Sequence, residues 1–93
     1  MNYTDTQLKQ ALAKMLPECI YENGELYIFD ADFAGLGGHR KVLDTELLHL
    51  CWLVEKTLSL HERFKCDEIL ENLIWVTWQQ RVKALAKVKG INI

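Results

Sequence analysis

The apolar residues of the N-terminal segment repeat with the spacing of one helix face. Between positions 5 and 16 they lie three or four residues apart, and polar residues take the opposite side. Thr4 and Gln7 have the spacing of a capping box, which satisfies backbone amides at a helix start. Pro17 ends the pattern because the residue before a proline avoids helical dihedral angles. We therefore predict a helix over 5–16.

The next segment alternates instead, which is the period of a β-strand. Residues 19–22 and 25–29 flank Asn23 and Gly24, the pair favoured in two-residue type I′ turns. We predict an antiparallel hairpin over 19–29 whose apolar face covers the central helix. That apolar face consists of Cys19, Tyr21, Leu26 and Ile28.

A glycine-rich stretch follows the hairpin. Residues 30–39 match neither a Walker loop nor a dinucleotide-binding loop, so we predict a connecting loop there. Residues 40–43 are candidates for a third strand, because a lone hairpin is only marginally stable in water. The sequence leaves open whether this third strand forms.

The most apolar part of the chain predicts a central helix over 44–58. Residues 47–54 contain one polar side chain, His49, so this helix is apolar almost all round. Asp44 stands at the N-cap position. The least apolar stripe of the helix includes His49 and Trp52. We expect Trp52 to face outward or toward a partner.

The C-terminal third predicts two further helical regions. Ser59 caps a segment over 60–75, and a shift of its apolar face predicts two pieces, 60–66 and 68–75. Periodicity leaves open whether 73–76 is helix or strand. The last helix, over 77–89, starts with a capping box at Thr77 and Gln80 and ends at Gly90. Its predicted buried stripe consists of Trp78, Val82, Leu85 and Ala86.

These elements predict an α+β fold. It has an N-terminal helix, a two- or three-stranded antiparallel sheet and then three helices, at 44–58, 60–75 (broken) and 77–89. Because the chain has 93 residues, with 49% hydrophobic and 26% charged residues, we expect a single globular domain over 1–93. The formal net charge of −2 argues against a general polyanion binder.

The same composition bears on the cellular setting. No apolar run approaches the roughly 18 residues of a membrane helix, and the N-terminus lacks the basic flank and apolar stretch of a secretion signal. Three widely spaced cysteines are an odd number, which favours free thiols in a reducing compartment over a disulfide framework. We therefore expect a cytoplasmic protein with no membrane contact.

Catalytic and metal-binding patterns are weak. The histidines and cysteines lack the spacing of zinc ligands, and we expect no metal, no cofactor and no small-molecule substrate. Cys51 lies in an apolar run, and Cys66 is the better candidate thiol because it lies near His61 and a predicted helix break. Carboxylates such as Asp30 and Asp32 need a cleft before they can act as acid and base. We expect no enzymatic activity and keep a small enzyme as an alternative.

Protein association is the function class that the sequence favours. Trp52 and Trp75 both fall on polar stripes, and His49 shares the stripe of Trp52. Tryptophan is enriched among the residues that dominate binding at interfaces. We predict a protein partner or a homodimer, with Trp52, Trp75 and His49 at the interface.

Nucleic-acid binding is the alternative. The last helix carries basic residues and no acidic ones. Lys83 and Lys87 are neighbours one turn apart, and Gln79, Gln80 and Lys83 come closest to sharing one basic and amide face. The candidate contacts are Gln79, Lys83 and Lys87. Phosphate contacts need a concentrated positive patch, which this helix supplies only in part.

Two segments resemble small open reading frames of phages and prophages. They are Val42-Leu43-Asp44-Thr45-Glu46-Leu47-Leu48-His49 and the Val-Thr-x-x-Gln-Arg-x-x-Ala-Leu pattern from Val76 to Leu85. The similarity extends over about a third of the chain and involves helix caps and core positions. The resemblance implies a compact α+β accessory protein in the cytoplasm of a bacterial host. It implies no catalytic or ligand-binding residue.

Overall fold

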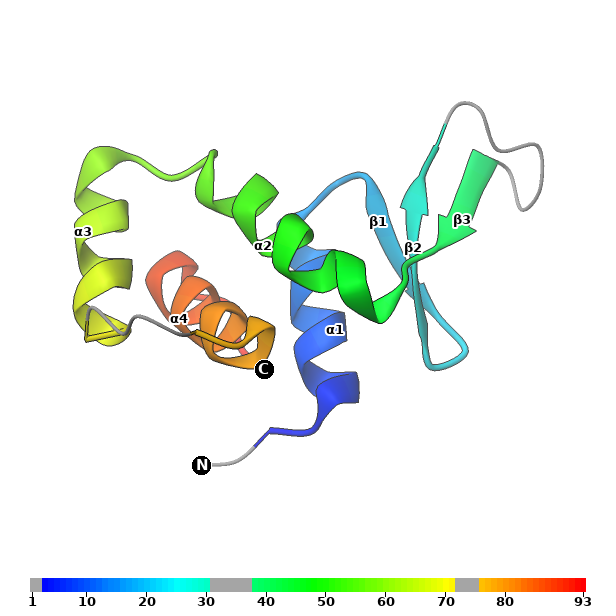
Figure 1. Ribbon diagram of the computed structural model, residues 1–93, viewed down its shortest axis with the longest axis horizontal. Helices are drawn as coiled ribbons and strands as arrows, with labels where there is room; N and C mark the ends of the chain where they lie inside the picture. The colour runs from blue at the N-terminus through cyan, green and yellow to red at the C-terminus, as the bar shows by residue number, and fades with distance from the viewer. Residues whose placement is uncertain (1–2, 31–37, 72–75) are drawn as a thin grey trace.

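A computed structural model describes residues 3–30, 38–71 and 76–93 of the chain (Figure 1). Within them the protein has the predicted α+β fold, with four α-helices and one three-stranded antiparallel sheet. In chain order the elements are α1 (Asp5–Met15), β1 (Cys19–Glu22), β2 (Glu25–Phe29), β3 (His39–Lys41), the 3₁₀ turn η2 (Asp44–Glu46), α2 (Leu47–Glu55), α3 (Leu60–Ile69) and α4 (Trp78–Lys89).

The capping box predicted for the first helix is present. The Thr4 hydroxyl accepts a hydrogen bond from the Gln7 amide at 3.2 Å, and the Gln7 side chain accepts one from the Thr4 amide at 2.8 Å. The helix ends at Met15, one residue before the predicted end, because Leu16 precedes Pro17 and is extended. Its apolar face is buried and consists of Leu8, Ala11, Leu12 and Met15.

The sheet has the order β1-β2-β3, and its hairpin has the predicted register. Glu22 faces Glu25 across a turn in which Asn23 and Gly24 both have positive φ, at 52° and 81°. Asparagine and glycine tolerate this left-handed conformation, so the turn closes without strain. The third strand does form, at His39–Lys41. Most of the loop predicted over 30–39 lies outside the described residues.

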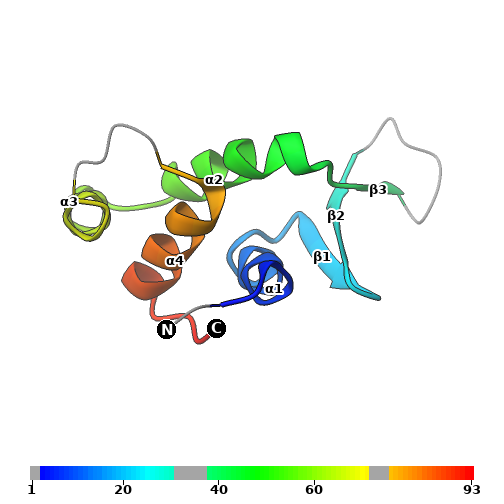
Figure 2. The ribbon, with the colours of Figure 1, turned by 60° about the horizontal axis from the view of Figure 1, so that its bottom comes forward.

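The apolar hairpin face covers a different helix from the one predicted. β1 and β2 pack against α1, whereas α2 packs against α1 and α4 (Figure 2). The connection from α1 to β1 is short, so the hairpin folds back onto the helix that precedes it. Cys19 and Leu26 are buried there, and Tyr21 and Ile28 are partly buried.

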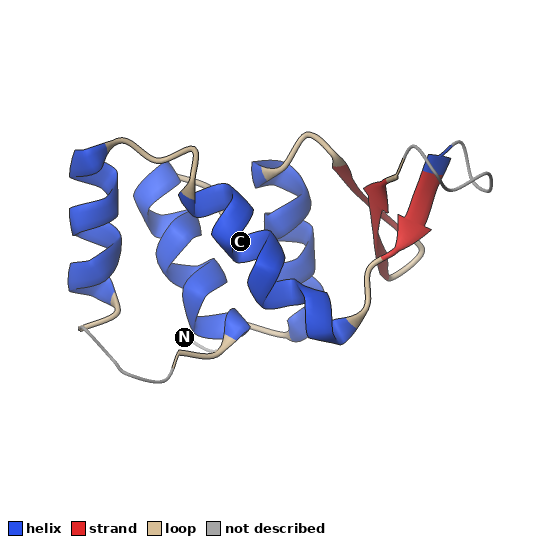
Figure 3. Cartoon of the chain, turned by 45° about the horizontal axis from the view of Figure 1, so that its top comes forward, coloured by secondary structure: helices blue, strands red, loops and turns tan. Residues whose placement is uncertain are grey.

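Three helices supply most of the core. α1, α2 and α4 pack together, while α3 packs on the outer side of α4, so that helices gather at one end of the molecule and strands at the other (Figure 3). In the described residues, α3 buries one side chain, Cys66. The buried residues of α1, α2 and α4 form one cluster together with the buried residues of the hairpin, Cys19 and Leu26.

The start of the second predicted helix differs from the prediction. Asp44 opens the 3₁₀ turn η2 and provides no side-chain cap. Glu46 does this instead, because its carboxylate accepts a hydrogen bond from the Leu43 amide at 2.9 Å. α2 then runs over Leu47–Glu55, three residues short of the predicted end at 58.

The predicted break in the third helical region is wrong. α3 begins after its Ser59 cap and continues through Cys66 and Asp67 to Ile69. The shift compares the face of Leu60 and Phe64 with the face of Ile69 and Leu70, and it misleads because Leu60 and Phe64 are not core residues: they are 69% and 60% exposed. The sequence left open whether 73–76 is helix or strand. Residues 73–75 lie outside the described residues, and Val76 belongs to neither a helix nor a strand.

The last helix follows its prediction closely. The Thr77 hydroxyl accepts from the Gln80 amide at 3.2 Å, and Gly90 ends the helix. Of the predicted stripe, Val82, Leu85 and Ala86 are buried and Trp78 is partly buried. Among the described residues, no helix has the combined length and apolar character needed to cross a bilayer.

Candidate functional site

The outward side of α2 carries an aromatic surface. We call it the Trp52 surface; it consists of Leu48, His49, Trp52 and Lys56. Helical spacing places these residues side by side, because positions three and four apart are neighbours on a helix. Trp52 is 50% exposed and Leu48 is 47% exposed, which confirms the outward direction predicted for Trp52. His49 is also exposed.

The side chains around Trp52 contact its ring directly. The imidazole of His49 lies with its centroid 5.7 Å from the indole centroid, and the rings are tilted by 37°. The Lys56 ammonium lies 3.6 Å from the indole centroid, which is cation–π geometry. These two contacts restrict the indole, so a partner that packs on it meets a partly ordered aromatic side chain.

A small cavity adjoins the C-terminal end of this surface. Its volume is about 200 Å³, and its lining comes from Trp52, Glu55, Lys56, Leu58, Arg63, Cys66 and Asp67. Glu55 accepts a hydrogen bond from Arg81 at 2.6 Å, so its carboxylate is engaged in an ion pair between α2 and α4. The cavity is small beside ligand pockets, which usually exceed about 300 Å³.

The three cysteines are buried free thiols. Burial, with a smaller contribution from Glu18, raises the pKa of Cys19 to about 11. Burial, with a smaller contribution from Glu55, raises the pKa of Cys51 to about 12. Burial also raises the pKa of Cys66, the candidate nucleophile, above its ordinary value. A raised pKa keeps each thiol protonated at neutral pH and therefore unreactive.

One of the two candidate carboxylates belongs to an ion-pair cluster. Asp30 accepts a hydrogen bond from Arg40 Nε at 3.1 Å, and the other side of the same guanidinium donates two bonds to Glu46, at 2.7 and 2.5 Å. Arg40 lies on β3 and Glu46 in η2, so the cluster ties the sheet to the start of α2. Asp32 lies outside the described residues.

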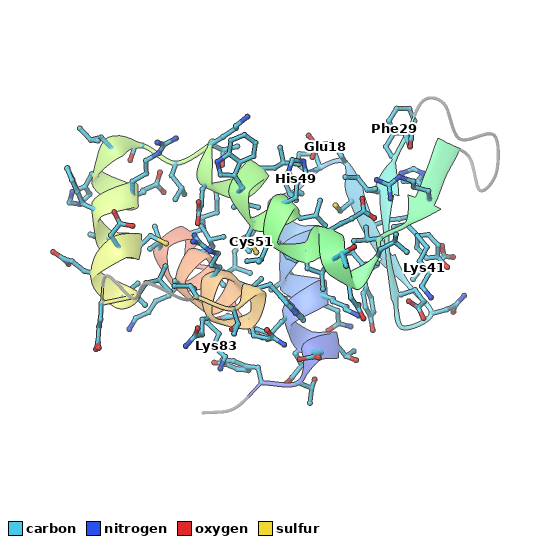
Figure 4. All side chains as sticks on the ribbon, in the orientation of Figure 1. Glu18, Phe29, Lys41, His49, Cys51 and Lys83 are labelled. Atoms are coloured by element: carbon cyan, nitrogen blue, oxygen red, sulfur yellow. The ribbon has the colours of Figure 1, made fainter. Side chains whose placement is uncertain are left out.

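The predicted nucleic-acid residues do not form one cationic face. The Gln79 side chain donates a hydrogen bond to Asp5 at 3.5 Å, and Arg81 pairs with Glu55. Lys83 and Lys87 line a separate groove beside residues 91–93. Figure 4 places Lys83 on the lower side of α4 and His49 on the upper side of α2, so the two candidate regions face different directions.

The structure brings together only part of the predicted interface. His49 and Trp52 are in contact, whereas Trp75 lies outside the described residues. The predicted interface did not include Leu48 or Lys56, although both lie four residues from Trp52 and Lys56 falls on the same polar stripe by helical spacing. In the described part of the chain, no three histidine, cysteine or acidic side chains lie close enough to hold a metal ion.

Comparison with known proteins gives no further assignment. None of the protein-family models, curated proteins and solved structures compared with the chain matches it.

Proposed function

We propose that the protein is a non-enzymatic accessory protein that acts through protein–protein contact, and that a second copy of the chain binds at the Trp52 surface. The observation that carries the proposal is the half-exposed Trp52 beside the exposed Leu48, on a helix whose other side lies in the core. An indole in contact with both His49 and Lys56 offers a large contact area at a small cost in side-chain entropy.

A twofold arrangement suits the order of residues along α2. Two copies of the helix packed antiparallel about Trp52 set Lys56 of one copy opposite Leu48 of the other. The two lysines then lie apart, and each lysine stem covers an apolar side chain. A parallel arrangement would set lysine against lysine, at a cost from like charges. The pattern therefore favours an isologous dimer, in which one surface binds its own copy.

The shape of the molecule leaves room for such a dimer. A stable interface takes about 800 Å² from each partner, and the accessible surface of the chain is 6284 Å². The molecule measures 41 × 27 × 24 Å, and α2 lies along its long side (Figure 2). Leu60 and Phe64 of α3 are further exposed apolar residues.

The state of the candidate catalytic groups, the cysteine thiols and Asp30, supports a non-enzymatic role. The thiols are buried with raised pKa values, and Asp30 is bound by Arg40. We further propose that the protein acts in the cytoplasm of a bacterial host as a phage- or prophage-type accessory protein. The resemblance of residues 42–49 and 76–85 to phage reading frames supports that setting, as do the free thiols.

Light scattering coupled to size-exclusion chromatography tests the dimer. We expect the wild-type protein to be dimeric at micromolar concentration and Trp52→Ala to be monomeric, because truncation removes the central contact. Phe29→Ala is the matched control. Phe29 is 53% exposed, a fraction similar to the 50% of Trp52, but it lies on the sheet, away from α2 (Figure 4). That variant should stay dimeric.

Two results would contradict the proposal. A wild-type protein that stays monomeric at high concentration excludes the second copy as the partner. A Trp52→Ala variant that stays dimeric, with unchanged circular dichroism, shows that the copies meet elsewhere.

A further inference from the structure

A groove lies on the other side of the molecule, between α4, the end of α3 and residues 91–93. We call it the Lys83–Lys87 groove, and its volume is about 540 Å³. Two lysines of α4, one turn apart, line it together with aliphatic and aromatic side chains. The lining residues that matter are Tyr3, Leu70, Lys83, Lys87, Ile91 and Ile93. The volume lies within the range of binding pockets in proteins.

The wall formed by residues 91–93 is fixed by hydrogen bonds. The Ile91 amide donates to the Ala86 carbonyl at 2.8 Å, and Lys14 Nζ donates to the Asn92 carbonyl at 3.3 Å. These bonds hold the segment against α4 and α1, which positions Ile91 and Ile93 beside the groove. A preformed wall of this kind lowers the entropic cost of binding.

The charges in the groove are unbalanced. Within the described residues, neither Lys83 nor Lys87 forms an ion pair, whereas the neighbouring Arg81 of α4 is paired with Glu55. Residues i and i+4 of a helix have Cβ atoms about 6 Å apart, so the two ammonium groups can reach two carboxylates at a similar separation. The groove thus combines unpaired positive charge with an apolar wall.

We propose that the Lys83–Lys87 groove binds an acidic and apolar peptide segment of a partner protein. The segment supplies two carboxylates about one helical turn apart for the lysines, with an aliphatic or aromatic side chain between them that packs on Leu70 and Ile91. This site is separate from the Trp52 surface and adds a second partner to the proposed dimer.

A nucleic acid fits the same groove less well. Phosphate binding gains affinity from several cations along the backbone, and this groove offers two. Arg81 and Gln79, which would have to extend the contact along α4, are engaged by Glu55 and Asp5. The aliphatic walls of the groove contribute no binding free energy with a phosphate, but they do so when they bury an apolar side chain.

Selection from a random dodecapeptide library, displayed on ribosomes, tests the proposal on the full chain. We expect enriched peptides to carry at least two Asp or Glu residues next to Leu, Ile or Phe. Their affinity should fall about tenfold for the double variant Lys83→Gln/Lys87→Gln, which loses two exposed charge pairs but keeps helix-forming side chains of similar shape. It should also fall with added salt.

Two controls separate this site from net charge and from the dimer. Lys65→Glu, at an exposed position of α3, makes the formal net charge of −2 more negative by the same two units; it should bind the selected peptides like wild type. Trp52→Ala should also bind them, while the double lysine variant should remain dimeric. Failure of peptide binding is therefore distinguishable from failure of the dimer.

Several results would overturn the proposal. They are a selection that enriches no peptide or no acidic one, and equal affinity for wild type and a folded Lys83→Gln/Lys87→Gln variant. Lysine-dependent binding of a labelled single- or double-stranded oligonucleotide, with no peptide selected, would assign the groove to nucleic acid instead.

Discussion

Arg40 connects two parts of the fold through one side chain. Its guanidinium contacts Asp30 at the end of β2 and Glu46 before α2. Glu46 also caps the 3₁₀ turn through the Leu43 amide. Hydrogen bonds from Arg40 first, and then from Leu43, lower the pKa of Glu46 to about 2. The folded state is therefore stabilised by the ionised form of this carboxylate.

The change Glu46→Gln tests this linkage. A lowered folded-state pKa gives stability that is complete above the unfolded value and is lost as the pH falls toward the folded value. We expect E46Q to lower the free energy of unfolding by about 1–2 kcal/mol at neutral pH, after allowance for partial exposure. The loss should shrink as the pH falls from about 5 toward 2. Urea unfolding at several pH values measures it.

Glu25→Gln is the control for this measurement. Glu25 pairs with Lys41 at 3.4 Å, and both side chains are exposed. Exposed pairs of this kind contribute less than about 1 kcal/mol, so E25Q should change stability little. If the effect of E46Q were the same in acid as at neutral pH, it would not come from the charge of Glu46.

Each helix that begins with a capping box was predictable from its own sequence. The boxes at Thr4, Ser59 and Thr77 form because the donors and acceptors lie within three residues of each other. The hairpin register was equally local, since Asn23 and Gly24 determine it. These elements need no knowledge of the rest of the chain.

Contacts between distant elements could not be predicted in the same way. The hairpin packs on α1 and not on the central helix, and the periodicity of a strand does not specify which helix its apolar face will cover. The predicted break in α3 failed because Leu60 and Phe64 look like core residues but are exposed. The Lys83–Lys87 groove likewise depends on residues 91–93 folding back against α4. His49 and Trp52 of the candidate site could be predicted together because they are three residues apart on one helix.

The ends of α3 and α4 differ in their chemistry. Glu71, after the last turn of α3, has φ of 54°, and Gly90 ends α4 with φ of 71°. A side chain in this left-handed region costs about 1 kcal/mol, while glycine adopts it freely. We expect Glu71→Gly to raise the free energy of unfolding by about 0.5–1 kcal/mol, measured by thermal denaturation.

Gly90→Ala is expected to change the free energy of unfolding in the opposite direction, because Gly90 has the left-handed conformation at the end of α4 that Glu71 has after α3. A Cβ at Gly90 would have no heavy atom within 4 Å, so only the backbone conformation is affected. We expect a loss of about 1 kcal/mol. If both variants destabilised the protein equally, the left-handed conformation would not explain either effect.

The whole molecule has a cohesive part and a loosely attached part. α1, α2 and α4 share the core with the hairpin, whereas α3 is packed chiefly on α4 and buries only Cys66 among its described residues. Elements with few buried apolar contacts open at lower free energy than the rest of a fold. The three cysteines lie in different parts of this arrangement, so they can report on it separately.

Thiol labelling should follow the attachment of the elements. We expect an aromatic disulfide reagent at neutral pH to react slowly with the native protein, because the thiols are buried and protonated. Cys66 should react first and Cys19 and Cys51 later, as peptide mapping by mass spectrometry would show. Equal rates at all three would mean that α3 opens only with the whole fold. Immediate reaction at Cys66 would reopen its candidacy as a nucleophile.

The strands at the two borders of the sheet have a consequence for how copies of the molecule can meet. β1 and β3 are outermost, with four and three residues, and each carries exposed charge, Glu22 on one and Lys41 on the other. Short, charged border strands discourage the backbone pairing that leads to aggregation. Growth by adding strands is therefore disfavoured at this end of the molecule, which is compatible with the closed dimer proposed through α2.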